Sequence, residues 1–447
     1  MRVHGLMLPC ACLLLAAGLP CLAADNRFTW DAAVGGGYTG NVFFNDTYQI
    51  SAYAARVSGG VGYSSVGPRS SLDLGYRTGY LWYDESTVNG VNNMPHALRF
   101  DLRQDWTQRL TFQAFARGEY TPEQEGFVDR VEDRFTVYQR AQRLAADSGL
   151  DWQFQASQRT DLRFGLRGAM VDYGDPVLGV EAPLADETLY QGTLGIGFTT
   201  GPSSRVGVDY GFQRQDYSRP AYAFRADTNG DGTGDSPVAG EALDGGSDTH
   251  TLDVDYSWRI SEQSYGAVAV GVYRTQARGE SNVNSGSDTD TSVLLRASVN
   301  SQLSRTVTAF YGASRDISSY GGFGGTALNE SAFAAFRFQT GQMTSLAAQA
   351  DYTRRKDVGE DDRSVSTLGA HLDWRHRLGK WGGYFVGYGY VDQNATGAQE
   401  VGDTTSTPGD PTLLYDYRDL QYDIVNMGFF FSKPGGTEGR ARGGRER

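Results

Sequence analysis

Strict alternation of apolar and polar residues, sustained in segment after segment, is the feature that most constrains the fold of this chain. In SSLDLGYRTGYLWY (70–83) the apolar side chains fall on one face of an extended strand, and the charged residues and glycines fall on the other. The pattern recurs in ALRFDLRQDW (97–106), TDLRFGLRGAM (160–170) and HTLDVDYSW (250–258). A period of two is that of a β-strand, so each segment is predicted to be a strand with one apolar and one charged face.

The connections between such segments alternate in length. Some have only a few residues, such as TQR at 107–109, whereas others are long and polar, such as YGDPVLGVEAPLADE at 173–187. Short turns at one end and long loops at the other are typical of hairpins in an outer-membrane barrel. We therefore predict an all-β fold, a transmembrane antiparallel up-and-down β-barrel of about 18 strands, in the range of about 16 to 18. A propeller blade would instead divide the same span among four shorter strands.

Aromatic residues gather near the ends of the predicted strands, in two groups. Two aromatic belts are typical of barrels at the two membrane interfaces, where amphipathic rings lie. A preference of aromatics for strands in general explains their number but not two bands. The group beside the short turns is Trp106, Trp152, Phe198, Trp258, Phe338, Trp374 and Trp381, and the group beside the long loops is Tyr80, Trp82, Tyr120, Tyr173, Tyr273, Tyr352, Tyr390 and Tyr417.

The two ends of the chain are predicted to lie outside the barrel. Residues 1–24 combine Arg2, an apolar stretch and small residues near Ala24, which is typical of a cleaved secretory signal. All three cysteines fall inside that segment, so the mature chain has neither disulfides nor thiolate chemistry. The predicted organisation is the signal peptide at 1–24, the barrel at 25–432 and a basic periplasmic tail at 433–447.

Gly35, Gly37 and Gly40 have the G-x-G-x-x-G spacing of a dinucleotide-binding turn. That turn holds a pyrophosphate only when a helix N-terminus follows it. Here β-forming residues and further glycines follow, so no nucleotide site is predicted. We expect these glycines to lie at the outer end of the first strand and to permit close packing there.

The chain resembles the porin-like outer-membrane β-barrels of Gram-negative bacteria, in particular the group often encoded with exopolysaccharide-export systems. The resemblance rests on the signal segment, GGGYTGNVFF (35–44), the alternating strands and the closing DIVNMGFFF (423–431). A tail, SKPGGTEGRARGGRER, follows where such barrels usually end on an aromatic residue, which leaves open where strand pairing ends. The resemblance implies a bacterial outer-membrane location, outer-membrane lipid, lipopolysaccharide and the barrel-assembly machinery as partners, and a transport or export role without catalytic residues.

The predicted inner face repeatedly presents charge. In a wide barrel these residues could line a water-filled path and set its selectivity, or they could form a cross-strand ion-pair lattice that stiffens the wall. We expect a porin-like channel for polar solutes, with saccharides or an exported polysaccharide as candidates; no nucleic-acid partner is expected, and the oligomeric state is left open. A non-conducting adhesin, assembly or scaffold barrel is the alternative. The selected lumen residues are Arg99, Asp101, Arg103, Asp105, Arg117, Glu119, Arg163 and Arg167.

One long loop contains DTNGDGTGD, in which Asp227, Asn229, Asp231 and Asp235 are spaced oxygen donors for a possible calcium ion. Position twelve is Val238 rather than a bidentate glutamate, so a plain polar loop is the other interpretation. No other cofactor is expected.

Catalysis has little support in the sequence, although a barrel hydrolase is a further alternative. His250 lies near Asp248, and His371 lies near Asp373. A strand histidine beside a carboxylate is more often a wall residue than a general base, and we predict that the protein is not an enzyme.

Overall fold

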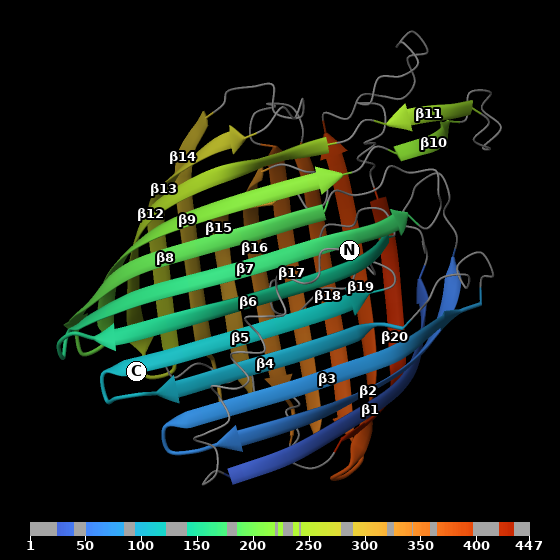
Figure 1. The fold of residues 1–447 in the computed structure, drawn as a ribbon. Coiled ribbons are helices and arrows are strands. Elements are labelled where there is room, and N and C mark those ends of the chain that lie inside the picture. The colour runs from blue at the N-terminus through green and yellow to red at the C-terminus, as the bar shows by residue number, and fades with distance from the viewer. Residues whose placement is uncertain are drawn as a thin grey trace.

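The computed structural model of the chain describes residues 25–39, 51–84, 94–121, 141–176, 186–219, 222–226, 236–240, 243–278, 289–319, 326–341, 343–357, 364–396 and 420–432. Within these ranges, 18 antiparallel strands form one sheet that closes on itself as a barrel (Figure 1). The sheet confirms the predicted fold class and the predicted strand number. Among the described residues, no helix is long and apolar enough to cross a membrane.

The barrel strands have 10 to 19 residues, and a strand of about 9–11 residues is enough to cross a bilayer. A separate antiparallel hairpin lies in the connection between the ninth and tenth barrel strands. The barrel strands are β1 (Asp25–Thr39), β2 (Ala52–Val66), β3 (Ser70–Tyr83), β4 (His96–Asp105), β5 (Leu110–Thr121), β6 (Ala141–Gln155), β7 (Thr160–Pro176), β8 (Asp186–Gly201), β9 (Ser204–Arg219), β12 (Leu243–Ser261), β13 (Ser264–Arg278), β14 (Thr289–Gln302), β15 (Val307–Ser319), β16 (Thr326–Gln339), β17 (Thr344–Asp357), β18 (Ser364–Arg377), β19 (Gly382–Thr396) and β20 (Leu420–Ser432). The hairpin consists of β10 (Tyr222–Ala226) and β11 (Ser236–Gly240).

Each barrel strand pairs with its neighbours along the chain, and β9 pairs with β12 across the inserted hairpin. The barrel closes where β1 pairs with β20, from Asp31 opposite Ser432 to Thr39 opposite Ile424. Ser432, opposite Asp31, is the last paired residue of β20 within the described part of the chain. The predicted signal at 1–24 and the predicted tail at 433–447 lie outside the described residues.

Short connections, such as 202–203 and 262–263, join the strands at one rim, and β1 begins and β20 ends at that same rim. The strand ends that border the long connections lie at the other rim (Figure 1). This alternation matches the up-and-down hairpins of outer-membrane barrels, in which the short turns are periplasmic and the long loops extracellular.

The apolar side chains lie on the outside of the barrel, where they are exposed. On β12, Leu252 and Val254 are half-exposed, and they lie beside Val270 and Val272 of β13. Trp258 lies on the same face, nearer to the short turns. Nearer to the long loops, this face carries the aromatic pair Phe212 and His250. The next pair towards the long-loop rim is charged, Arg214 opposite Asp248. An apolar band between aromatic residues, with charges beyond it, is the surface of a barrel that spans a lipid bilayer.

The most tightly packed apolar cluster also lies on this outer face. Phe100 and Leu102 of β4 are buried against Phe112 and Ala114 of β5, and Trp152 of β6 packs at their edge. In a soluble protein the apolar face of a sheet packs against a second apolar layer, but here the apolar face is turned outward and lipid takes the place of that layer.

The predicted aromatic belts are right in outline and wrong at two positions. Trp106 and Trp381 are exposed at the short-turn rim as predicted. Tyr273, however, is buried on the inner face, where its hydroxyl donates a hydrogen bond of 2.8 Å to Asp290. Tyr173 has the inner-face position as well, opposite Arg143. Both were misassigned because proximity to a loop does not determine which face a strand residue occupies. Tyr417 lies outside the described residues.

Gly35 and Gly37, near the start of the chain, lie where β1 pairs with β20 and closes the barrel. Gly35 of β1 lies directly opposite Gly428 of β20. A Cβ atom at Gly37 would lie 2.6 Å from the carbonyl oxygen of Val425, which is too close for any side chain. The prediction of close backbone packing is therefore confirmed for these two glycines, and Gly40 lies outside the described residues.

Candidate functional site

The charged face of the strands is the inner wall of the barrel. Strand register places Arg99 opposite Arg117, and Arg167 opposite Gly149, on the face away from the exposed apolar side chains. Ion pairs on this face also join strands that are not neighbours, such as Arg77 of β3 with Asp31 of β1. All eight predicted lumen residues lie on this inner face: Arg99, Asp101, Arg103, Asp105, Arg117, Glu119, Arg163 and Arg167.

On one side of the wall, β3 and β4 carry exposed arginines. Each has a carboxylate partner on the inner face, but the guanidinium side chain is much more exposed than its partner. The guanidinium groups are therefore the more exposed ends of these pairs. The pairs are Arg77 with Asp31 of β1 at 2.8 Å (61% and 33% exposed), Arg99 with Asp101 (65% and 30%), and Arg103 with Asp105 at 3.4 Å (56% and 37%).

On β5 the other two predicted residues make different contacts. The guanidinium carbon of Arg117 lies 5.4 Å from the ring centroid of Phe115, a cation–π distance. Glu119 accepts a hydrogen bond of 3.2 Å from the hydroxyl of Thr121. On the neighbouring strands, Arg167 of β7 donates a hydrogen bond of 3.1 Å to Asp147 of β6.

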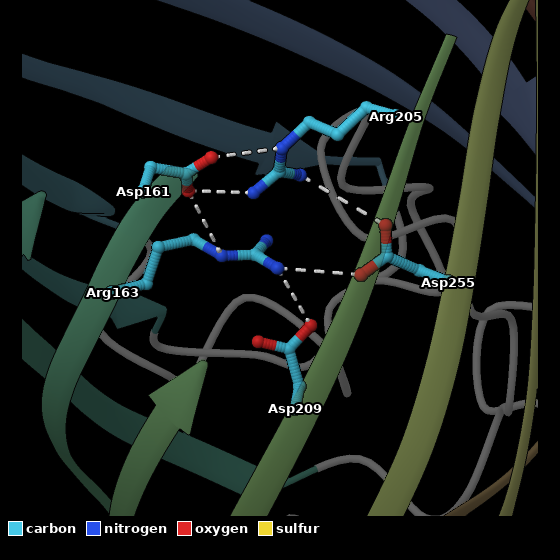
Figure 2. Close-up of polar contacts among 5 residues, drawn as sticks. All are labelled: Asp161, Arg163, Arg205, Asp209 and Asp255. Atoms are coloured by element: carbon cyan, nitrogen blue, oxygen red, sulfur yellow. Dashed lines mark hydrogen bonds and ion pairs between the residues drawn. The ribbon is translucent and has the colours of Figure 1, made fainter. Parts of the chain in front are cut away.

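Farther around the wall, five side chains from three strands form one ion-pair cluster (Figure 2). Arg205 of β9 donates two hydrogen bonds to Asp161 of β7, from Nε at 3.1 Å and from Nη2 at 2.7 Å. Arg163 of β7 donates from Nη2 to Asp209 of β9 at 3.0 Å and to Asp255 of β12 at 3.3 Å. Its Nε lies 3.8 Å from Asp161, so the two arginines share that carboxylate.

Six of the eight predicted residues therefore take part in the ion pairs described above, and all eight lie on the inner face. The two interpretations of the charged face are not exclusive, because the same pairs that stiffen the wall present their exposed ends to the interior. A role for these residues in selectivity stays a prediction.

Arg163 is the one cluster member among the eight selected lumen residues; Asp161, Arg205, Asp209 and Asp255 are not. The signal was present in RVGVDYG (205–211), where Val206, Val208 and Tyr210 alternate with Arg205, Gly207 and Asp209. This is the same period-two pattern that identified Arg163 on β7.

Of the two histidines discussed for catalysis, His371 lies on the inner face of β18 opposite Gly389, and His250 lies on the outer face with an aromatic partner. The Nδ1 atom of His250 lies 2.7 Å from the hydroxyl of Tyr210 on the outer face, and Asp248 pairs with Arg278 at 3.1 Å instead. His96 makes a similar 2.9 Å contact with Tyr76. These contacts fit histidines of the aromatic belt better than a general base.

The calcium candidates Asp227, Asn229, Asp231 and Asp235 lie outside the described residues. The described hairpin brings the flanking Ala226 and Ser236 together as paired residues. Within the described ranges, no group of three or more His, Cys, Asp or Glu side chains could hold a metal ion.

We keep calcium binding as a prediction. If these oxygens bind the ion, millimolar calcium should protect residues 227–235 from protease, because binding stabilises the bound form. Asp231→Ala should abolish that protection, as followed by the rate at which the fragments appear on a gel. Equal cleavage rates with calcium and with chelator would leave only a polar loop.

Comparison with known proteins finds likeness in structure only. No family model matches the sequence, and no curated protein matches it. OccK2 (OpdF) of Pseudomonas aeruginosa, solved in complex with glucuronate, is 10% identical, with a TM-score of 0.45 over 91% of this chain and 98% of that one. OccAB4 of Acinetobacter baumannii is 9% identical, with a TM-score of 0.43 over 91% and 98%. The ferric citrate transporter FecA is 12% identical, with a TM-score of 0.44; 83% of this chain is covered, and it spans only 60% of that chain.

Proposed function

We propose that the protein is an outer-membrane channel through which small polar solutes, preferentially anions, diffuse. The observation that carries the proposal is the set of exposed arginines on the inner wall of β3 and β4. A barrel of 16 to 18 strands encloses more space than inward side chains fill, and a passage with low-dielectric walls strengthens the effect of wall charges on ions. The apolar outer band supplies the lipid-facing surface that such a channel needs.

Acidic saccharides are the solute class that we propose. Phe310 of β15 and Phe333 of β16 lie on the inner face with ring centroids 4.8 Å apart, and Phe310 is 40% exposed. These strands lie half of the 18-stranded ring away from β4, so the aromatic pair faces the arginine wall across the interior. Aromatic rings can contact the C–H faces of a sugar, and guanidinium groups can bind its carboxylates. An exported acidic polysaccharide would meet the same two walls.

Conductance in a planar bilayer tests the channel. We expect discrete current steps and, in a low-salt gradient, a reversal potential displaced towards that of the anion. Replacing Arg77, Arg99 and Arg103 with glutamine should move the reversal potential towards that of the cation, because the aspartates then lose their compensating charge.

The matched control is Arg274→Gln on the outer face of β13, opposite His250. It removes one positive charge from the outer face and none from the interior, so the reversal potential should not move. If the inner triple variant and this outer control behaved alike, the wall arginines would have no part in selectivity.

One observation favours a non-conducting adhesin, assembly or scaffold barrel. Inner-face side chains near the long-loop rim are almost completely buried on strands around the barrel, among them Tyr83, Tyr273, Ala327 and Val391. Inner residues of an open pore would be exposed to water. A folded protein that never conducts, even after residues 227–235 are removed, would support this second function and contradict the channel.

A further inference from the structure

We propose that Gly195, Gly197 and Gly207 determine the selectivity of the interior by holding the charges of the ion-pair cluster flat against the wall. The inference rests on the proposed channel function. It concerns residues that carry no charge and that face the interior on β8 and β9, between the strands that supply the charged side chains.

The register of the sheet places these glycines directly between the charged residues. In one row across the wall, Asp161 of β7 is followed by Gly197 of β8, Gly207 of β9 and Asp255 of β12. In the next row, Arg163 is followed by Gly195 and then by Asp209. Every inner-face position between the two carboxylates of the first row is therefore a glycine.

The glycines matter because the cluster spans several strands. Neighbouring strands lie about 4.8 Å apart, so β7 and β9 are separated by roughly 10 Å, and β7 and β12 by roughly 14 Å. Arg163 and Arg205 can bridge these gaps only if their side chains lie along the wall. A side chain on β8 or β9 at these rows would occupy the same space.

The space that each missing Cβ would need is already filled by a charged group. At Gly197 the Cβ would meet the guanidinium of Arg205, with Cζ 2.6 Å away. At Gly195 it would meet the carboxylate of Asp209, and at Gly207 it would meet Asp255 and Nη2 of Arg163. These glycines thus leave free the space along the wall that the charged side chains of the cluster occupy.

The consequence is an asymmetric wall. Arg163 and Arg205 are 33% and 28% exposed, about half the exposure of Arg99 on β4, which pairs within its own strand. These glycines therefore hold two guanidinium groups back from the interior, whereas the arginines of β3 and β4, farther along the sheet, remain exposed.

Two single substitutions test the proposal with opposite expected signs. Gly197→Ala should push the guanidinium of Arg205 into the interior, shift the reversal potential towards that of the anion and reduce the single-channel conductance. Gly195→Ala should displace the carboxylate of Asp209 and shift the reversal potential towards that of the cation. Both clashes are with the ends of side chains rather than with backbone, so the barrel should still fold.

Gly192→Ala is the matched control on the same strand. Gly192 lies on the outer face, where a Cβ would make only an ordinary 3.8 Å contact with Leu166, so no shift is expected. In the Gly197→Ala background, Arg205→Gln should remove the anion shift, because the displaced charge is then absent.

A labelling experiment separates the geometry from conduction. Phenylglyoxal, which modifies accessible arginines, should label Arg205 in the folded Gly197→Ala variant several-fold faster than in the parent, as measured by peptide mass spectrometry. A parent that conducts while both alanine variants keep its reversal potential would overturn this inference and leave the channel intact. A parent that never conducts would overturn the proposed function, and the selectivity role with it.

Discussion

An arginine placed at Val270 is expected to destabilise the folded barrel by about 2–4 kcal/mol, the cost found for a basic side chain at the bilayer midplane of a barrel. Val270 lies at the middle of β13, on the outer face, and half of its surface is exposed. In the membrane that exposure is to hydrocarbon, so a charge there loses its hydration without gaining a partner. The measurement is reversible urea unfolding of the protein in lipid vesicles.

The control for this substitution is Ala267→Arg, three residues away on the same strand. Ala267 is exposed on the inner face, where a guanidinium would remain in water, so the cost should be near zero. Equal destabilisation at both positions would contradict the assignment of the two faces of β13.

Gly428→Val should prevent closure of the barrel altogether. A Cβ atom at this position would lie 2.6 Å from the Cα atom of Gly35 and closer still to the carbonyl oxygen of Val34. Both belong to the backbone of β1, so they can move away only if β1 and β20 separate. We expect complete loss of the fast-migrating folded form on unboiled gels.

Gly59→Val on the adjacent strand β2 is the control for closure. Its Cβ would lie 3.6 Å from the carbonyl oxygen of Asp31, an ordinary contact, so this variant should fold and migrate as the parent does. A Gly428→Val protein that kept the folded mobility would show that the seam tolerates a side chain and that the glycine pair is not required.

The faces of the strands could be predicted from the sequence because lipid and water select residues of opposite kind at alternate positions. This is why all eight selected charged residues lie on the inner wall. The prediction placed Tyr273 in an aromatic belt because it is aromatic and lies near a loop. Tyr273 is two and four residues from Gly271 and Ala269, so it lies on the same inner face as they do. Position along a strand and face of a strand are separate questions, and only the second follows from parity.

The partners of the charged residues could not be predicted in the same way. Arg163 and Asp255 are 92 positions apart in the chain, and they meet only because the registers of β8, β9 and β12 place two glycines between them. Each register depends on the length of its turn and on the shear with which the whole barrel closes, which no local segment specifies. The alternation shows which residues face inward, but not which of them touch.

The pairing of the wall charges also limits the distance over which their electric field acts. A guanidinium held 2.8 Å from a carboxylate, as in Arg77 and Asp31, is a dipole seen from a distance, and the field of a dipole falls off faster than that of a single charge. Mobile salt shortens the range further, to about 8 Å at physiological ionic strength. A small ion near the barrel axis would therefore interact only weakly with the wall charges, whereas a solute wide enough to touch the wall would interact with each guanidinium in turn. If the interior conducts as we propose, it should discriminate weakly among simple salts and sharply among large solutes.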